Sequence, residues 1–203
     1  RLLDATVKFH RELPLPGETI RYEIEIEKFL RQGETYLFLF HFDGFIDSER
    51  LITMTDGCAG FFTEEEVKNS GGIILTDEDS RPCAGKRSSD WQDLVPLSAG
   101  SMDDASIDAL RTGQLAKAFG DAFEGFTLPE NLRLPGGRMK LLDRILSLEP
   151  EGGRFGLGLI RGEADIDPKA WFLTCHFVDD MVMPGTLMYE CCAHTLRILL
   201  QRM

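Results

Sequence analysis

Residues 175–192 read CHFVDDMVMPGTLMYECC, and this stretch predicts a loop that runs directly into a helix. Pro184-Gly185 marks the start of that helix, because the fixed φ of proline suits a first helical turn and its missing N–H costs nothing there. His176 lies before the loop, and Glu190 follows His176 by fourteen residues, inside the helix. An imidazole and a carboxylate on one loop-and-helix unit indicate a site for acid–base chemistry.

The predicted helix runs from Gly185 to about Arg202. Its first turn carries unpaired N–H groups, which together with the helix dipole stabilise negative charge, so the Gly185 amide suits a carbonyl that becomes enolate-like. Its residues are apolar nearly all round, a pattern typical of a helix buried on several sides. In such a helix the carboxyl of Glu190 would stay protonated and serve as an acid, while His176 can act as a base near neutral pH.

The same polar residues also have structural interpretations. Asp179 and Asp180 are better explained as turn residues that fix the loop than as catalytic acids. Glu190 could instead pair with a basic neighbour. His176 could instead be a structural residue that precedes a loop. The adjacent Phe177, the helix start and the acid together favour the catalytic interpretation. Structural roles are expected for the other histidines, His10, His41 and His194.

Composition limits the partners of the chain. It has 203 residues, is 43% hydrophobic and carries a formal charge of −12. It can therefore bury a sizeable core, but it lacks the Lys/Arg surplus that nucleic acid or an anionic membrane requires. An acidic partner, such as an acyl carrier protein, would have to dock on a local basic spot. The candidates for this spot are Arg138, Lys140, Arg144, Arg197 and Arg202.

The cysteines and the apolar stretches predict a cytoplasmic protein. The five cysteines are odd in number, and their spacing matches neither a disulfide framework nor a zinc site. The most apolar stretch, near 187–200, contains Glu190, His194 and Arg197 and is therefore not a membrane span. No secretory signal is recognised. The chain begins with Arg1 in place of an initiating Met, and its last residue lies inside a helical pattern. We therefore expect it to be a fragment of a longer polypeptide.

A meander of strands is predicted for residues 1–68, within an α+β fold. Residues 20–26 alternate between apolar and charged side chains, the period of two that marks a half-buried strand. Further strands are predicted at 36–42, which is apolar on both faces, and at 51–54. Turn residues such as Gln32-Gly33 separate the strands, and no helix is expected in this section.

The remaining residues divide into a middle segment, 69–130, and a last section, 131–203. The middle segment starts as a linker rich in Gly, Ser, Asp and Arg. It ends in one amphipathic helix, which Ser101 begins as the first residue of a capping box. The last section is predicted to hold strands at 139–148 and 154–166, followed by the loop and helix described above.

The two ends of the chain resemble halves of a known fold. Residues 137–203 are similar to the amino-terminal half of the β-hydroxyacyl-acyl-carrier-protein dehydratases of the hotdog fold, above all to dehydratase domains of polyunsaturated fatty acid synthases. Residues 3–66 are similar to the carboxy-terminal half. The motifs that carry this resemblance are Leu141-Leu-Asp-Arg-Ile145, Trp171-Phe172, Cys175-His-Phe177 and Val182-Met-Pro-Gly185 in the first case, and Phe9-His-Arg-Glu-Leu13 and Pro16-Gly-Glu18 in the second.

The resemblance implies a hotdog fold, in which an antiparallel sheet wraps around a long central helix. The two halves stand in reversed order along this chain. The chain therefore fits a window cut from a tandem double hotdog, from the second half of one repeat through the first half of the next. Two further arrangements are open: the halves fold together as one permuted hotdog, or two chains exchange their halves.

The resemblance also implies roles for individual residues. His176 matches the family's catalytic histidine, Glu190 its catalytic carboxylate, and Gly185 the glycine whose amide binds the thioester carbonyl. Val182 matches the position whose carbonyl orients the histidine, and Phe177 is expected to contact the substrate. In the family, the histidine and the carboxylate of one active site come from opposite hotdogs. His176 and Glu190 would therefore serve different sites.

The activity implied by the resemblance is removal of water from a β-hydroxyacyl thioester, carried on the phosphopantetheine arm of an acyl carrier protein. No metal or redox cofactor is implied, and the domain would pair with a second copy or an adjacent hotdog. Met181 stands where many relatives have proline, and Met188-Tyr189 replaces a smaller pair, so the acyl tunnel is expected to differ in shape. Two alternatives are open: a hotdog thioesterase, in which a carboxylate activates water, and a non-catalytic hotdog of a multidomain synthase.

Overall fold

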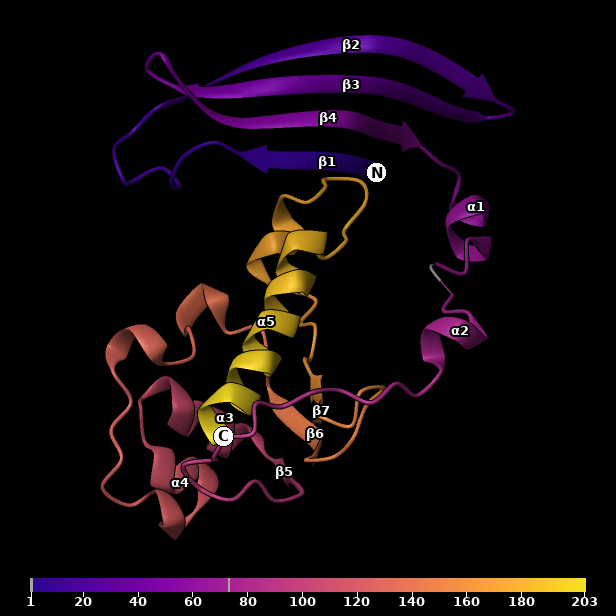
Figure 1. Cartoon of the computed structure of the whole chain (residues 1–203). Coiled ribbons are helices and arrows are strands. Elements are labelled where there is room, and N and C mark those ends of the chain that lie inside the picture. The colour runs from indigo at the N-terminus through magenta and orange to yellow at the C-terminus, as the bar shows by residue number, and fades with distance from the viewer. Residues whose placement is uncertain (1, 73) are drawn as a thin grey trace. The chain divides into compact units, whose positions relative to one another are not determined.

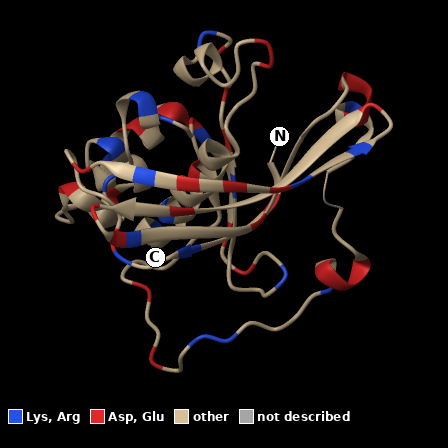
Figure 2. Ribbon diagram, turned by 90° about the horizontal axis from the view of Figure 1, so that it is seen from above, with Lys and Arg blue, Asp and Glu red and all other residues tan. Residues whose placement is uncertain are grey.

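The chain divides into two units, Arg1–Ile74 and Leu75–Met203. The computed structural model describes residues 2–72 and 74–203. Each unit contains an antiparallel sheet, and the second ends in a long helix, α5 (Gly185–Arg202) (Figure 1). This arrangement confirms the predicted α+β class. Charged residues are spread over strands, helices and loops, and acidic side chains are the majority (Figure 2).

The first unit is built on a four-stranded antiparallel sheet in the order β1-β4-β3-β2 (Figure 1). Its strands are β1 (Leu2–Phe9), β2 (Ile20–Gln32), β3 (Thr35–Ile46) and β4 (Glu49–Phe61). The strands predicted within β2, β3 and β4 are confirmed. The sequence pattern does not predict β1, because two register shifts against β4 interrupt its alternation. Gly33, with a φ of +63°, forms the tight connection between β2 and β3.

The strand register gives this sheet one apolar and one polar face, since directly paired residues share a face. The apolar face includes the pairs Ile24–Phe42, Ile26–Phe40, Phe29–Phe38, Val7–Met54 and Phe9–Ile52. On the polar face, His41 Nδ1 lies 2.7 Å from Glu27 Oε1, and the Thr53 hydroxyl donates to Asp43 at 2.6 Å. An antiparallel sheet with this division covers an apolar partner with one face and meets solvent with the other.

A short helix, α1 (Glu64–Asn69), follows the sheet, so the prediction of a first section without helix is wrong at its end. Thr63 caps this helix in a capping box. The Thr63 side chain accepts the Glu66 amide, and the Glu66 carboxylate accepts the Thr63 amide at 2.8 Å. The Thr63-Glu-Glu-Glu66 sequence carries this signal. Glu66 also accepts the hydroxyl of Thr35, which joins the helix to the start of β3.

The second unit contains a three-stranded antiparallel sheet in the order β5-β6-β7. Its strands are β5 (Gly100–Met102), β6 (Arg144–Glu149) and β7 (Leu159–Glu163). The predicted strands at 139–148 and 154–166 are therefore too long. Gly137–Met139 forms a 3-10 turn, η3, and the chain before β7 turns at Gly153 and Gly156, where φ is +79° and +65°. Glycine permits this left-handed backbone, and the strand begins only after it.

Two short helices between β5 and β6 replace the single amphipathic helix predicted there. They are α3 (Asp104–Arg111) and α4 (Leu115–Phe119), and Gly113, with a φ of +76°, separates them. The N-cap of α3 is Asp103 and not Ser101, because the Asp103 carboxylate accepts a backbone N–H at 2.9 Å. The other short helices are α2 (Asp77–Ser80), η1 (Asp121–Phe123), η2 (Glu130–Leu132) and η4 (Trp171–Thr174).

The core of the second unit forms where α3, β6 and α5 meet. Ile107 and Leu110 of α3 and Ile198 of α5 are fully buried, and Ile145 of β6 is 1% exposed. The same cluster contains Leu115, Phe123, Leu134 and Leu142. This core fixes the C-terminal half of α5, and through it the direction of the helix that follows the candidate site.

Only part of the surface of α5 is buried, so the prediction that it is buried on several sides is wrong for the chain as described. Leu196 and Leu200 are 52% and 62% exposed, whereas Ile198 between them is inaccessible. The helix therefore keeps one apolar side that the second unit does not cover. Within residues 2–72 and 74–203, none of the helices combines the length and apolar character that a membrane span requires.

Candidate active site

The imidazole of His176 is held by the backbone of Val182. His176 Nδ1 lies 3.0 Å from the carbonyl oxygen of Val182, and the Val182 amide donates to the carbonyl oxygen of His176, also at 3.0 Å. The His176 amide in turn donates to the carbonyl of Phe172 in η4 at 3.0 Å. When Nδ1–H donates to a carbonyl, the lone pair of the ring lies on Nε2, as a general base requires.

The loop between these two residues, 177–181, is a tight turn. The Phe177 amide donates to the carbonyl of Asp180 at 2.7 Å, so Asp180 contributes to the turn through its backbone. The peptide bond between His176 and Phe177 is cis. The ring of Phe177 stacks on the imidazole, with centroids 4.1 Å apart, and the side chain of Met181 is 69% exposed. The loop thus places apolar side chains next to the histidine.

The first turn of α5 leaves two amides available directly after this loop. Pro184 is the N-cap, and its carbonyl accepts the amides of Leu187 and Met188 at 3.0 and 3.1 Å. Within the described residues, no side chain caps the helix and no acceptor binds the amides of Gly185 and Thr186. An oxygen that gains negative charge would be stabilised there by unpaired N–H groups and by the helix dipole.

Glu190 lies near the start of α5 and pairs with His194, one helical turn further on. The distance between Glu190 Oε2 and His194 Nε2 is 3.6 Å. The Glu190 side chain is 45% exposed, so the expectation that this carboxyl is buried is wrong for the chain as described. The described hydrogen bonds of His176 go to Val182 and Phe172, its ring stacks on Phe177, and none of these contacts includes Glu190. The structure therefore brings together the histidine and its loop, but not the histidine and the acid.

His194 is the residue of this region to which the sequence analysis gives only a structural role. It is 3% exposed, and burial lowers its pKa, an effect that Glu190 partly offsets. A buried, neutral imidazole next to a carboxylate can fix the orientation of that carboxylate. The signal in the sequence is the spacing of four residues between Glu190 and His194, which places both side chains on the same side of a helix.

Most of the cations predicted as a docking spot are engaged within the second unit. Arg144 pairs with Asp165, Glu163 and Asp104, and Lys140 lies 3.1 Å from Asp108. The guanidiniums of Arg197 and Arg202 donate to backbone carbonyls. Among the described residues, only the Arg138 side chain of these five has neither a hydrogen bond nor an ion pair. It lies over the ring of Trp171, the first residue of η4, at 5.9 Å from the centroid.

Comparison with known proteins identifies the part of the chain that holds this site. Residues 134–203 match the family of FabA-like domains. This part of the chain is a FabA-like domain. Over 207 aligned residues, 98% of the chain is 33% identical to a subunit of the polyunsaturated fatty acid synthase of Thraustochytrium sp. (strain ATCC 26185 / S-3). The chain spans only 13% of the length of that protein.

The FabA-like domain contains every part of the candidate site described above. η4, the His176 loop and α5 lie within residues 134–203, together with β6 and β7. The sheet of the first unit lies outside the domain match but inside the stretch similar to the synthase. The FabA-like domain is thus the part of the chain from which a reaction can be argued.

Proposed function

We propose that the FabA-like domain belongs to a dehydratase that removes water from a β-hydroxyacyl thioester. The observation that carries this proposal is the position of His176. Its Nδ1 is fixed on the carbonyl of Val182 at 3.0 Å, which leaves the lone pair on Nε2, and Val182 precedes the uncapped first turn of α5 by three residues. A base and a group that stabilises an oxyanion are what abstraction of an α-proton from a thioester requires. The domain match and the similarity to the synthase support the same reaction class.

In the proposed mechanism, the thioester carbonyl oxygen accepts the Gly185 amide. His176 Nε2 takes a proton from Cα, and the carbonyl oxygen gains negative charge that the Gly185 amide stabilises. The electron pair of the broken C–H bond then forms the Cα=Cβ double bond while the bond between Cβ and the hydroxyl oxygen breaks. A carboxyl protonates the departing hydroxyl, so the products are water and an α,β-unsaturated thioester. Phe177, whose ring stacks on the imidazole, is proposed to contact the acyl chain.

We assign the carboxyl to Glu190 of a paired hotdog domain. Two observations support separate sites for the two residues: Glu190 contacts His194, and the described contacts of His176 lie elsewhere. A partner that covers Glu190 would remove the water that now reaches its half-exposed side chain, and this favours the protonated acid. His194 then acts as a positioning residue, since it holds the carboxyl from the buried side of α5.

The acyl group is proposed to arrive on the phosphopantetheine arm of an acyl carrier protein. The unpaired guanidinium of Arg138 supports this, because it lies over Trp171, which precedes His176 by five residues. The phosphate of the arm and the acidic surface of a carrier protein are both anions that a free guanidinium binds well. Arg138 is therefore the docking residue that this proposal names.

Mass spectrometry of a β-hydroxyacyl carrier protein incubated with the chain tests the reaction, since dehydration lowers the mass by one water. We expect turnover by the parent and a loss of at least about 100-fold in His176→Ala, the effect of removing a general base. His10→Ala, a matched substitution in the first unit, should react at the parent rate. Dehydration is reversible, so the crotonyl form should gain water with the same dependence on His176.

The other possible results of this assay distinguish a different base, a thioesterase and a non-catalytic domain. Equal turnover by the parent and His176→Ala would contradict the proposed base. Release of a free thiol would identify hydrolysis, the thioesterase alternative. Binding of the substrate by a folded parent without turnover would favour a non-catalytic domain.

Mixing two inactive variants tests whether one site takes its histidine and its acid from different domains. His176→Ala and Glu190→Gln are each expected to lose turnover. In a mixture, a pair of unlike chains would contain one site with an intact histidine and an intact carboxylate, so part of the parent activity should return. Failure to recover activity, while both variants stay folded, would argue that the two residues serve one site.

A further inference from the structure

The backbone of His176 is held by η4, a 3-10 helix that is too short to be rigid by itself. The amides of His176 and Cys175 both donate to the carbonyl of Phe172, at 3.0 and 3.3 Å. Within the described chain, no side chain caps the start of η4. Hydrogen bonds in so short a 3-10 helix have poor geometry. The direction of the Phe172 carbonyl therefore depends on the contacts that join η4 to the rest of the second unit.

Trp171, the first residue of η4, joins this helix to η3. Its Nε1 donates to the carbonyl oxygen of Arg138 at 3.0 Å. The Trp171 carbonyl accepts the hydroxyl of Thr174 at 2.7 Å, so the first and last residues of η4 are linked. The indole is 38% exposed and lies outside the buried core cluster. The directional contact between η4 and η3 is therefore the indole N–H.

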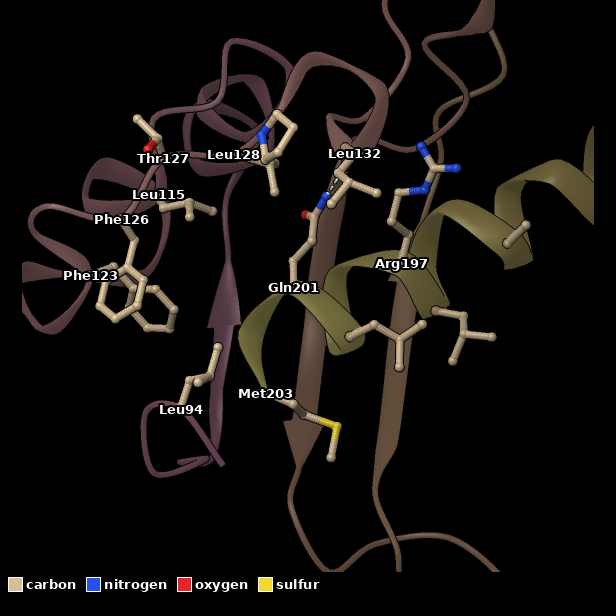
Figure 3. Close-up of a pocket in the computed structure, with 14 residues that line it drawn as sticks. Leu94, Leu115, Phe123, Phe126, Thr127, Leu128, Leu132, Arg197, Gln201 and Met203 are labelled. Carbon is tan, nitrogen blue, oxygen red and sulfur yellow. Dashed lines mark hydrogen bonds between the residues drawn. The ribbon is translucent and has the colours of Figure 1, made fainter. Parts of the chain in front are cut away.

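The segment before η3 is anchored on the C-terminal half of α5. Gln201 Nε2 donates to the carbonyl of Leu132 at 2.6 Å (Figure 3). Arg197 donates to the carbonyl of the next residue, Arg133, at 2.9 Å. Leu134 is 3% exposed, and η3 begins three residues after it. The carbonyl that accepts the indole N–H is therefore held in place by α5.

The two carbonyls that hold His176 are connected to α5 by different routes. Val182 is close to the helix in sequence, since Pro184 is the N-cap of α5. Phe172 is connected to the helix through Trp171 and η3. The imidazole Nδ1 can meet the Val182 carbonyl at 3.0 Å only while both routes keep their spacing. Every residue of both routes belongs to the second unit.

Side-chain packing leaves this spacing adjustable. A cavity of about 150 Å³ is bordered by η3, η4 and the segment before α5. Leu141, Phe172 and Met183 line it, together with Arg138 and Trp171. Atoms that face empty space lack the contacts that would resist a movement. The hydrogen bond between Trp171 and Arg138 joins two of the elements around the cavity and supplies the missing restraint.

We propose that Trp171 is a positioning residue, whose indole N–H keeps the His176 imidazole in the tautomer that donates from Nδ1 to Val182. This inference rests on the proposed function, because it concerns the base of that reaction. Without the indole N–H, η4 could move relative to η3 and the Nδ1 hydrogen bond would lengthen. The imidazole would then also populate the tautomer with its proton on Nε2. In that form Nε2 has no lone pair with which to take a proton.

Nitrogen-15 NMR of the labelled 203-residue chain tests this role without substrate, because protonated and unprotonated ring nitrogens have different chemical shifts. The spectra are recorded at about pH 8, above the range in which free histidine titrates. The His176 signal is identified by its absence from His176→Ala. We expect it to show Nδ1–H in the parent and a mixture of tautomers in Trp171→Phe. Trp91→Phe is the matched control, since it removes an indole N–H that donates to Asp93 at 2.8 Å, and it should leave the His176 signal unchanged.

Two further variants separate the hydrogen bond from the ring and from the guanidinium above it. In Trp171→His, the imidazole Nε2 occupies the ring position of the indole Nε1, so His176 should keep the parent tautomer. Arg138→Gln removes the guanidinium but keeps the carbonyl that accepts the indole N–H. The His176 tautomer should therefore be that of the parent in this variant too. Far-UV circular dichroism verifies that each variant is folded.

Kinetics with a β-hydroxyacyl carrier protein distinguish positioning of the base from docking of the substrate. Trp171→Phe is expected to lower kcat at least about 10-fold and to change KM by less than about two-fold, because a misplaced base slows the chemical step. Arg138→Gln should mainly raise KM, as loss of a docking contact does.

Several results would overturn the positioning role. One is an unchanged His176 tautomer in a folded Trp171→Phe, and another is a parent that already populates both tautomers. Equal tautomer mixtures in Trp171→His and Trp171→Phe would assign the effect to the indole ring, and so would overturn the role of its N–H. If the tautomer responds as expected but the parent does not turn over, the dehydratase is contradicted while positioning of the imidazole by Trp171 is supported.

Discussion

His194 is a buried ionisable residue whose surroundings disfavour its charged form. Its side chain is 4% exposed, and burial is the largest cause that lowers its pKa. Glu190 acts in the opposite direction, while Arg197 and Arg111 reinforce the effect of burial. The imidazole is therefore neutral in the folded chain near pH 7. In the unfolded chain it titrates with the ordinary value of 6.5.

This difference predicts that the free energy of unfolding decreases as the pH falls below 6.5. In that range the unfolded chain binds a proton at His194 that the folded chain does not bind, so protonation favours unfolding. A single group contributes at most about 1.4 kcal/mol per pH unit. Urea denaturation at about pH 7.5 and about pH 5.5 measures the effect in the parent and in His194→Gln. The parent should lose more stability between the two pH values, and equal losses would contradict the prediction.

At the scale of residues, sequence reasoning works where the chain itself supplies the neighbours. His176, Val182 and Gly185 lie within ten positions, so a loop followed by a Pro-Gly helix start is enough to place them in one region. The exposure of Glu190 cannot be predicted from its sequence neighbours, because it depends on which surface covers α5. The burial of His194 depends on the core around Ile198 and cannot be read from a pattern of single residues.

At the scale of elements, β7 and α5 approach so closely at Gly162 that only glycine fits without a shift. A Cβ atom at this position would lie 2.6 Å from Thr195 Oγ1 and 2.7 Å from Leu142 Cδ1. Packed interiors do not contain contacts of that length, so a larger residue would push the helix and strand apart. This contact sets the distance between α5 and the sheet of the FabA-like domain.

Gly162→Ala is therefore expected to destabilise the second unit by about 1–3 kcal/mol through overpacking. Thr195→Ala removes the nearest atom and should recover part of that loss in the double variant. Gly100→Ala in β5 is the matched control, because a Cβ there would meet no atom within 4 Å. Its stability should stay within about 0.5 kcal/mol of the parent. Urea denaturation followed by tryptophan fluorescence measures the free energy of unfolding of the parent, Gly162→Ala, Thr195→Ala, the double variant and Gly100→Ala. Equal stability of Gly162→Ala and Gly100→Ala would refute the overpacking.

The elements that sequence predicts well are those with a long, regular pattern. β2 alternates over residues 20–26, and α5 begins at the Pro-Gly pair and keeps helical residues to Arg202. The errors occur where a glycine interrupts a pattern that would otherwise continue. Gly113 divides the predicted single helix, and the turn at Gly153 shortens the strand predicted from 154. Such breaks depend on backbone conformation, which a hydrophobic pattern does not report.

At the scale of the whole molecule, the two units have different spectroscopic signals. Both tryptophans, Trp91 and Trp171, lie in the second unit, whereas the long strands that dominate the first unit contribute only to the far-UV signal. The two probes therefore report on different parts of the chain. This makes the independence of the units measurable.

We predict that tryptophan fluorescence and far-UV circular dichroism give different urea transitions in the parent chain. Ile46→Ala, at a site 3% exposed in the first unit, should shift only the far-UV transition, by a loss of about 2–5 kcal/mol. Ile145→Ala, at a site 1% exposed in the second unit, should shift the fluorescence transition. Coincident transitions in all three proteins would mean that the units unfold together.

The organisation of the chain into two units is harder to predict from the sequence than the strands within each unit. Alternation in β2 predicts that one face of the sheet is apolar, but it does not predict what covers that face. The same holds for α5, whose apolar residues indicate burial although Leu196 and Leu200 remain exposed. An apolar pattern in the sequence indicates that a face is buried, but it does not identify the surface that covers that face.

The paired hydrogen bonds between His176 and Val182 have a consequence for redesign of the site. Val182 takes part through its main-chain N–H and C=O alone, so any residue except proline at that position can hold the imidazole in the same orientation. The side chains of Val178, Asp179 and Met181 can then be varied, provided that the turn closes. Libraries over these three positions would change the surface beside the imidazole without moving the imidazole itself.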